Sequence, residues 1–302
     1  MATPRSSARD PAPPTASARP PGLADLLRNT RFEVLPLEGI EEQVREHLST
    51  EVKLTVTASP RRGLDTTLQL TERLTAAGYA TVPHISARLV RDQGHLTELL
   101  DRLRAGGVRE LFVLAGDASE PAGSYSGAAE LLEAMGERRA DFDAIGITGY
   151  PESHHLISDE ETIRAMFAKA PMATHIVSQI CFDASTIAWW IGEVRRRGTD
   201  LPIWIGVPGC VPHAKLLRVS MKIGLGESAR FLSHHRNWIS RFLTRQFKPG
   251  RLVRELTPVA TDPAARVAGF HLYTFNEVAR TERWRSGLLE RLDKQGRDVG
   301  HA

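Results

Sequence analysis

Side chains that can hold or move protons occur at the ends of short apolar runs along this chain. They are Glu33, Thr57, His84, Asp117, Tyr150, His154 and Gln179. The set pairs no serine or cysteine with a base, so it is not typical of nucleophilic catalysis. Acids and histidines beside hydroxyl and amide groups suit the binding of a polar heterocycle and the movement of protons or hydride around it.

The apolar runs themselves predict eight strands, separated by segments of helical periodicity. The expected strands are Phe32–Pro36, Val52–Thr57, Ala80–Ser86, Glu110–Leu114, Ala144–Thr148, Thr174–Gln179, Ile203–Val207 and Gly269–Thr274. The expected helices are Asp65–Ala77, Leu96–Ala105, Ala128–Glu137, Glu160–Ala168 and Ala184–Arg197, with a longer helical region at Lys215–Phe247. Strands reached through helices predict parallel pairing.

Eight such units predict an α/β fold, a (β/α)₈ TIM barrel, rather than an open sheet. No G-x-G-x-x-G follows the first strand and no P-loop motif occurs. In such barrels the C-terminal strand ends share one face, which would gather the polar side chains into one site.

Composition excludes several classes of protein. The 39 Lys+Arg and 36 Asp+Glu leave a formal net charge of only +3, which argues against nucleic-acid binding. No apolar run reaches the roughly 18 residues of a membrane span. Cys181 and Cys210 form no disulfide framework, so a reducing, cytoplasmic location is expected. The pairs His154-His155 and His234-His235 lack a second ligand pair, and no metal site is expected.

The first 22 residues differ from the rest in composition. They contain six prolines and no Leu, Ile, Val or aromatic residue, so they have little to bury. We therefore expect a disordered N-terminal tail over residues 1–22 and one TIM-barrel domain over residues 23–302.

Seven short motifs occur in an order that resembles a known family. FEVLP, VPHIS, LAGD, GYPESHH, SQICFD, VPGCVP and GFHLYTFNE, spread between Phe32 and Arg280, are together similar to the methylenetetrahydrofolate reductase family. The resemblance implies a TIM barrel that holds FAD. It also implies a folate substrate, with 5,10-methylene- and 5-methyltetrahydrofolate interconverted and NAD(P)H as the usual electron donor.

The resemblance implies roles for individual residues. Glu33 would be the general acid that protonates the folate and opens its methylene bridge to an iminium. Asp117 would lie between flavin and pterin, and Gln179 would contact the folate. The implied flavin contacts are Thr57, His84, Gly116, Asp117, Tyr125, Tyr150 and His154. From the residues alone, Glu33 could equally form an end-of-strand salt bridge, Asp117 a turn and Gln179 a cap.

Departures from the family pattern affect the implied cofactor contacts. Ala115 stands where Arg is common, and Glu161 and Ala168 fall near an expected Asp and Lys, with Lys169 one residue away. Weaker FAD binding would follow, or a flavin-independent relative that uses NAD(P)H directly. A folate-binding protein without catalysis is a third hypothesis.

The segment after the seventh strand leaves further alternatives open. Lys215, Arg218 and Lys222 could attract an anionic glutamate tail or form a solvated helix face, and Glu277 follows Asn276 where Arg is common. The aromatic residues Phe231, Trp238 and Phe242 suit a core-facing stripe or the subunit interface of a homo-oligomer. The choice of NADH or NADPH and the direction of the reaction stay open.

Overall fold

The computed structural model describes residues 21–58, 61–152, 159–216 and 247–299. Several sequence-based predictions therefore lie outside the described residues. They are nearly all of the N-terminal tail, His154, and most of the 215–247 region with Arg218, Lys222, Phe231, Trp238 and Phe242.

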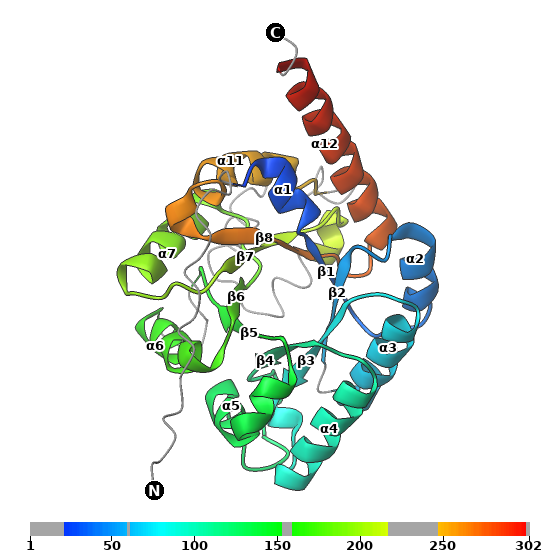
Figure 1. Ribbon diagram of the computed structural model, residues 1–302, viewed down its shortest axis with the longest axis vertical. Helices are drawn as coiled ribbons and strands as arrows, with labels where there is room; N and C mark the ends of the chain where they lie inside the picture. Colours follow the sequence, from blue (N-terminus) through cyan, green and yellow to red (C-terminus); the bar gives the residue numbers. More distant parts are fainter. Residues whose placement is uncertain (1–20, 59–60, 153–158, 217–246, 300–302) are drawn as a thin grey trace, which may run out of the picture.

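Eight parallel strands close into a barrel, as the sequence predicted (Figure 1). Each strand pairs with its neighbours in sequence, and the last pairs with the first. The strands are β1 Arg31–Val34, β2 Lys53–Val56, β3 Thr81–Ser86, β4 Glu110–Leu114, β5 Ala144–Gly149, β6 His175–Ser178, β7 Ile203–Pro208 and β8 Val267–Tyr273. The (β/α)₈ prediction is confirmed, with each strand end within two residues of its expected position.

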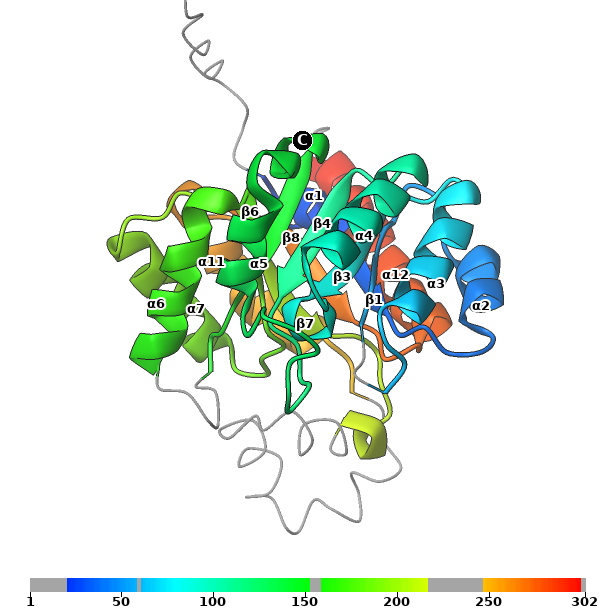
Figure 2. The same ribbon diagram turned by 90° about the horizontal axis from the view of Figure 1, so that it is seen from below.

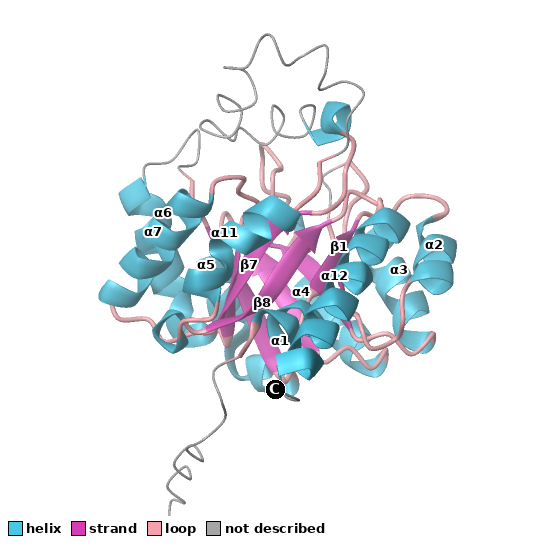
Figure 3. Cartoon of the chain, turned by 90° about the horizontal axis from the view of Figure 1, so that it is seen from above, coloured by secondary structure: helices cyan, strands magenta, loops and turns pink. Residues whose placement is uncertain are grey.

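Helices surround the barrel, and the loops that follow the strands gather on one face (Figures 2 and 3). The predicted helices correspond to α3 Asp65–Ala76, α4 Gln93–Ala105, α5 Ala128–Met135, α6 Asp159–Lys169 and α7 Ala184–Arg196. Helices that the sequence analysis did not specify are α1 Leu23–Arg28, α2 Ile40–His47, α11 Gly250–Ala260 and α12 Val278–Val299. Short 3₁₀ turns occur at Ala87–Leu89, Gly136–Asp141, Ala170–Met172 and Pro263–Ala265.

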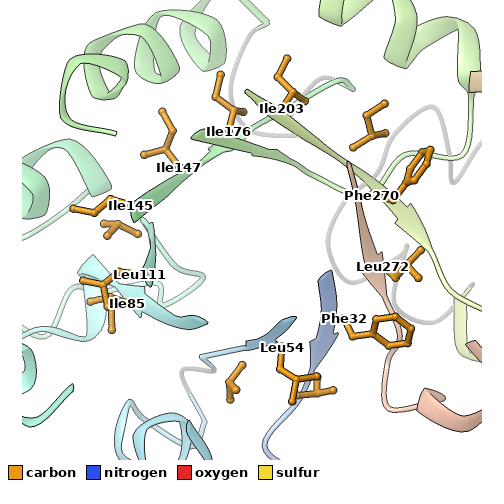
Figure 4. Packing of buried hydrophobic residues seen from close by; sticks show 14 of the residues in the cluster. Phe32, Leu54, Ile85, Leu111, Ile145, Ile147, Ile176, Ile203, Phe270 and Leu272 are labelled. Carbon is orange, nitrogen blue, oxygen red and sulfur yellow. The ribbon is translucent and has the colours of Figure 1, made fainter. Parts of the chain in front are cut away.

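Successive side chains of each strand point to opposite faces of the sheet and so form two apolar layers. Side chains such as Phe32, Leu54 and Ile147 point away from the ring of strands and pack beneath the helices (Figure 4). The alternate positions face the barrel interior, where a small apolar group contains Val82 and Phe112. The interior therefore has room for polar groups, while the helix-facing layer supplies most of the buried apolar surface.

A buried ionic network fills the N-terminal end of the barrel. Arg31 and Lys53 both bind the Glu110 carboxylate, and Nε2 of His175 lies 3.2 Å from Oε1 of that carboxylate. Burial alone would raise the pKa of Glu110, but His175 and the two cations hold it well below its usual range. The Arg31 guanidinium lies 3.8 Å from the centre of the Trp204 ring. These paired charges close this end, so the candidate site lies at the other.

Within the described residues, no helix is long and apolar enough to cross a membrane.

Candidate active site

Glu33 lies inside the barrel between two histidines. Its Oε2 is 3.1 Å from Nε2 of His271 on β8 and 3.6 Å from Nε2 of His84 on β3. All three side chains are buried. The ring of His84 packs edge-on against Phe112, with centroids 4.8 Å apart. The structure thus brings the predicted Glu33 and His84 together and adds His271, which sequence analysis did not single out within GFHLYTFNE.

Burial sets the protonation states of this group. It raises the pKa of Glu33 to about 7, with the nearby His84 acting in the opposite direction. It lowers the pKa of His84 to about 4 and, together with the charge of Arg31, that of His271 to about 3. At neutral pH both imidazoles are therefore neutral, and Glu33 carries a proton in about half of the molecules. This is the behaviour expected of a general acid that works near pH 7.

Several buried polar atoms around Glu33 have no hydrogen-bond partner among the described residues. They are Nε2 of His84, Nδ1 of His271 and Oγ1 of Thr55, which faces Glu33 across the β1–β2 pair. Buried polar atoms are nearly always hydrogen-bonded in folded proteins. These three atoms are therefore suited to meet the polar edge of a ligand.

Two tyrosines connect Glu33 to the loop after β4. Tyr273 lies opposite Glu33 in the β1–β8 register, and its hydroxyl donates to the Ser178 carbonyl at 3.0 Å. Burial raises the pKa of Tyr273, and the charge of Glu33 and the nearby Tyr150 add to this effect. Burial also raises the pKa of Tyr150, with a contribution from the negative charge of Asp117. The predicted Tyr150 and Asp117 are thus electrostatic neighbours.

Gly116 creates the turn that presents Asp117. Its φ is +91°, a conformation that glycine tolerates and other residues rarely adopt. A Cβ at this position would lie 1.8 Å from Oγ of Ser86, which itself donates to the Ala115 carbonyl at 3.1 Å. Gly116, which the resemblance implies as a cofactor contact, is therefore also required by the backbone conformation of this turn.

Arg88 holds the same loop in place. Its guanidinium donates to the carbonyls of Ala118 at 2.6 Å, Ser119 at 2.6 Å and Ser126 at 3.1 Å. Sequence analysis missed this residue, because an arginine shortly after a strand is usually a surface charge.

Hydrogen bonds between the residues that follow β8 and the end of β1 position Glu33. The Asn276 amide accepts from Leu35 N at 2.8 Å and donates to Leu35 O at 3.0 Å. The Thr274 hydroxyl donates to the Glu33 carbonyl at 2.5 Å. Asn276 has a φ of +64°, which asparagine tolerates better than most residues. Sequence analysis quoted this motif without assigning these roles.

The remaining predicted residues have mainly local contacts. Oε1 of Gln179 accepts from Ile180 N at 3.0 Å, which leaves the amide NH₂ as the group available to a ligand. Thr57 follows β2 and uses its carbonyl to accept from Thr67. Tyr125 is buried among the helices and donates to Gln93 of α4 at 3.0 Å, and no interaction within the described residues links it to Glu33.

Lys169 supplies a buried cation near the end of β5. Its Nζ donates to Oγ1 of Thr148 at 3.1 Å, and burial lowers its pKa to about 8. No ion pair involves Lys169 within the described parts of the chain. Lys169 is one residue away from the position where the family pattern has a lysine. Its amine is nevertheless directed at β5.

Other candidate groups are held by neighbours. Lys215 pairs with Glu277 at 3.0 Å, so this lysine is not a free charge. The Cys181 thiol donates to Glu152 at 3.0 Å, and burial raises its pKa. In the part of the chain that the structure describes, no group of three His, Cys, Asp or Glu residues could hold a metal ion.

Comparisons with known proteins agree with the motif resemblance. A family model described as methylenetetrahydrofolate reductase matches residues 37–223. Methylenetetrahydrofolate reductase 2 of Saccharomyces cerevisiae is 26% identical over 183 residues, which cover 57% of this chain and 28% of that protein. Methylenetetrahydrofolate reductase 1 of Schizosaccharomyces pombe is 28% identical over 123 residues, or 37% of this chain and 20% of that protein. The matches thus span less than a third of either relative.

One solved structure shares the fold. It is an uncharacterized protein from Clostridium thermocellum that binds two copies of 5-methyl-5,6,7,8-tetrahydrofolic acid. The TM-score is 0.60 at 10% sequence identity, and the match covers 86% of this chain and 94% of that one. Glu33 and His271 lie outside the family-model range, so their roles are argued from the geometry above.

Proposed function

The chain belongs to the methylenetetrahydrofolate reductase family, and we propose that it is an oxidoreductase that interconverts 5,10-methylenetetrahydrofolate and 5-methyltetrahydrofolate. NAD(P)H is the proposed electron donor, and FAD the proposed cofactor. The observation that carries this proposal is the buried Glu33, with a pKa of about 7, between two neutral histidines. The reaction would belong to cytoplasmic one-carbon metabolism and the supply of methyl groups for methionine.

Glu33 performs the acid step in this proposal. Protonation of the folate opens its methylene bridge to an iminium, which is the species able to accept hydride. A carboxyl group with the usual pKa of about 4.5 would be almost wholly ionised at pH 7. Burial keeps about half of Glu33 protonated, and His271 at 3.1 Å holds the carboxyl group in place before and after it gives up the proton.

The barrel mouth contains features that fit FAD. His84 has a buried nitrogen without a hydrogen-bond partner, Lys169 offers a buried cation suited to a phosphate, and Gly116 allows the turn that presents Asp117. We assign flavin contacts to Thr57, His84, Gly116, Asp117, Tyr125, Tyr150 and His154, with Lys169 added. When bound, such a flavin supplies hydride chemistry. Lys169 supports the flavin-dependent hypothesis over the flavin-independent one, despite Ala115.

Asp117 and Gln179 are the proposed pterin contacts. Asp117 is exposed beside Tyr150 and can accept hydrogen bonds from the pterin. Gln179 has its carbonyl oxygen engaged by Ile180 N, so we assign its NH₂ group as a donor to a pterin acceptor.

The test begins with the visible spectrum of freshly purified protein. We expect a flavin spectrum that bleaches anaerobically with NADH or NADPH and recovers on addition of methylenetetrahydrofolate. A colourless preparation that still oxidises NAD(P)H with this folate would support the flavin-independent alternative. Absence of folate-dependent turnover with either donor, in protein supplied with FAD, would overturn the proposal.

A further inference from the structure

The loop between β4 and α5, residues 115–127, carries Asp117 and contains no helix or strand. Such a loop has no hydrogen-bond ladder of its own, so its position depends on contacts with neighbouring segments. One such neighbour is the segment that follows β3 and begins with the 3₁₀ turn Ala87–Leu89. Arg88 lies in that turn and is half-buried.

Arg88 binds the chain on both sides of Asp117. Its backbone N–H donates to the Ala115 carbonyl at 3.0 Å, and its Nε donates to the Ala118 carbonyl at 2.6 Å. The other two guanidinium nitrogens donate to two more carbonyls of the same loop, at 2.6 and 3.1 Å. Asp117 therefore stands on a short stretch of backbone that one residue fixes at both ends.

The loop also packs closely against the segment after β3. The Ala122 N–H donates to the Arg88 carbonyl at 2.9 Å. A Cβ at Gly123 would lie 1.6 Å from the carbonyl oxygen of Arg91, so the absence of a side chain there allows the two backbones to meet. The guanidinium contacts are thus part of a broader attachment between the two segments.

A guanidinium group is chemically suited to hold such a loop. Its donors lie in a rigid plane and can bind several carbonyl oxygens at once, whereas a lysine has one ammonium group at the end of a flexible chain. No ion pair joins Arg88 to Asp117, and the structure describes both residues. Arg88 therefore fixes the backbone around Asp117 without neutralising its exposed carboxylate, which can still meet a ligand.

Strand β3 connects this loop to the proposed acid. Nε2 of His84 lies 3.6 Å from Oε2 of Glu33. Two residues further along β3, the Ser86 hydroxyl donates to a carbonyl of the Asp117 loop at 3.1 Å, and Arg88 follows directly. The stretch 84–88 thus contacts both the Glu33 side of the site and the Asp117 side, and it sets their relative position.

We propose that Arg88 is a positioning residue for the folate step, which holds the Asp117 carboxylate where it meets the pterin while Glu33 supplies the proton. The inference rests on the proposed function, in which both carboxylates act on one bound folate. Arg88 itself contacts neither folate nor flavin, so its effect passes through Asp117. Misplacement of such a group by about 1 Å can lower a rate on the order of 10²-fold.

The first measurement is the steady-state kinetics of Arg88→Ala with methylenetetrahydrofolate. We expect kcat/KM for this folate to fall by roughly 10- to 100-fold, because the Asp117 carboxylate is no longer held in place. If Arg88→Ala does not fold, Arg88→Lys replaces it. That variant keeps the charge but not the planar set of donors, so it should show a smaller loss of the same kind.

Arg195→Ala is the matched control. The Arg195 guanidinium also donates to three carbonyls, those of Thr199, Leu201 and Ala265 at 2.7–3.0 Å, but these residues precede β7 and β8 at the opposite end of the barrel. Arg195→Ala should lose a similar amount of thermal stability and keep the wild-type kcat/KM. An equal kinetic loss in the two variants would reveal a general effect of destabilisation and would overturn the inference.

A double-mutant cycle tests whether Arg88 acts through Asp117. Asp117→Ala should itself lower kcat/KM, and Arg88→Ala should cause little further loss in that background. Losses that multiply would overturn the inference and leave the proposed function intact. Wild-type kinetics in Asp117→Ala would instead overturn the role of Asp117 in the proposed function.

Chemical rescue gives a readout that a purely structural loss would not show. Guanidinium chloride, at concentrations well below those that unfold proteins, should restore part of the activity of Arg88→Ala. Sodium chloride at the same ionic strength should not. Because guanidinium otherwise destabilises proteins, a decline of activity without any recovery would count against a positioning role for Arg88.

Discussion

Oε2 of Glu33 lies 3.1 Å from Nε2 of His271, although the two residues are 238 positions apart in the sequence. They stand on β1 and β8, the strands whose pairing closes the barrel. The proposed acid is therefore completed only when the last strand joins the first. Thr274 and Asn276, directly after β8, bind the β1 end at Glu33 and Leu35 and hold this closure in register.

Glu33→Gln should remove the acid step. We expect the rate of methylenetetrahydrofolate reduction to fall by about 10²–10⁴, the usual contribution of a general acid, while folate binding changes only a few-fold. Steady-state kinetics and equilibrium binding would measure both. Glu38→Gln, at an exposed position in the turn between β1 and α2, should retain the wild-type rate. A rate loss of less than a few-fold in Glu33→Gln would contradict the catalytic assignment.

The same substitution should stabilise the protein at neutral and alkaline pH. The pKa of Glu33 rises from 4.5 to about 7 on folding, so the native state binds this proton more tightly than the unfolded state. The stabilising contribution is complete below pH 4.5 and is lost as the pH rises through 7. We expect the unfolding free energy of Glu33→Gln to exceed that of the wild type increasingly over this window, by on the order of 3 kcal/mol. Denaturant titrations at pH 5, 6, 7 and 8 would test the trend, and a constant difference would refute it.

The pH dependence of the reaction should follow the protonated form of Glu33. We expect kcat/KM for methylenetetrahydrofolate to be level below pH 7 and to fall about tenfold per pH unit above it. Oxidation of NAD(P)H by bound flavin does not use this proton and should lack that alkaline limb. Rapid-reaction measurements of the two half-reactions would separate them. An identical alkaline limb in both half-reactions would exclude Glu33 as its source.

Gly116→Ala should disturb the loop that carries Asp117. The added methyl group would lie 1.8 Å from Oγ of Ser86, at a φ of +91°. We expect lower stability and reduced flavin content. Ser86→Ala in the same chain should restore part of the loss by removing that oxygen, whereas the φ strain would remain. A double-mutant cycle on melting temperature and bound flavin would quantify the coupling between the two substitutions. The coupling should be absent if the loop moves so that the added methyl group avoids Ser86.

Lys169→Met should weaken the proposed FAD site. The substitution keeps the length of the buried side chain but removes its charge and its hydrogen bond to Thr148. We expect about a tenfold loss of FAD affinity, in line with the loss of one charge-assisted contact. Lys169→Arg should retain most of the affinity. Titration of flavin-depleted protein would measure both variants, and an unchanged affinity in Lys169→Met would remove this residue from the site.

Much of the fold could be predicted from local patterns. Strands such as β4, ELFVL, are apolar runs bounded by polar residues, and α4 and α7 begin at aspartates that accept from His95 N and Thr186 N. The shorter helices gave weaker signals. In α2 only Ile40 and Val44 are buried, and α11 contains Pro258, which argues against a helix in a sequence.

The sequence by itself determined the number and order of the strands, because the pattern that indicates a strand lies within a short run of neighbouring residues. It also placed Glu33, His84, Asp117 and Gln179 at strand ends, and hence on one face of the expected barrel. Only the tertiary structure decided that His271 meets Glu33 and that Arg88 holds the Asp117 loop. It also decided that Glu33 has a pKa near 7. These properties depend on burial and on partners from distant strands, which barrel closure brings together and no local pattern encodes.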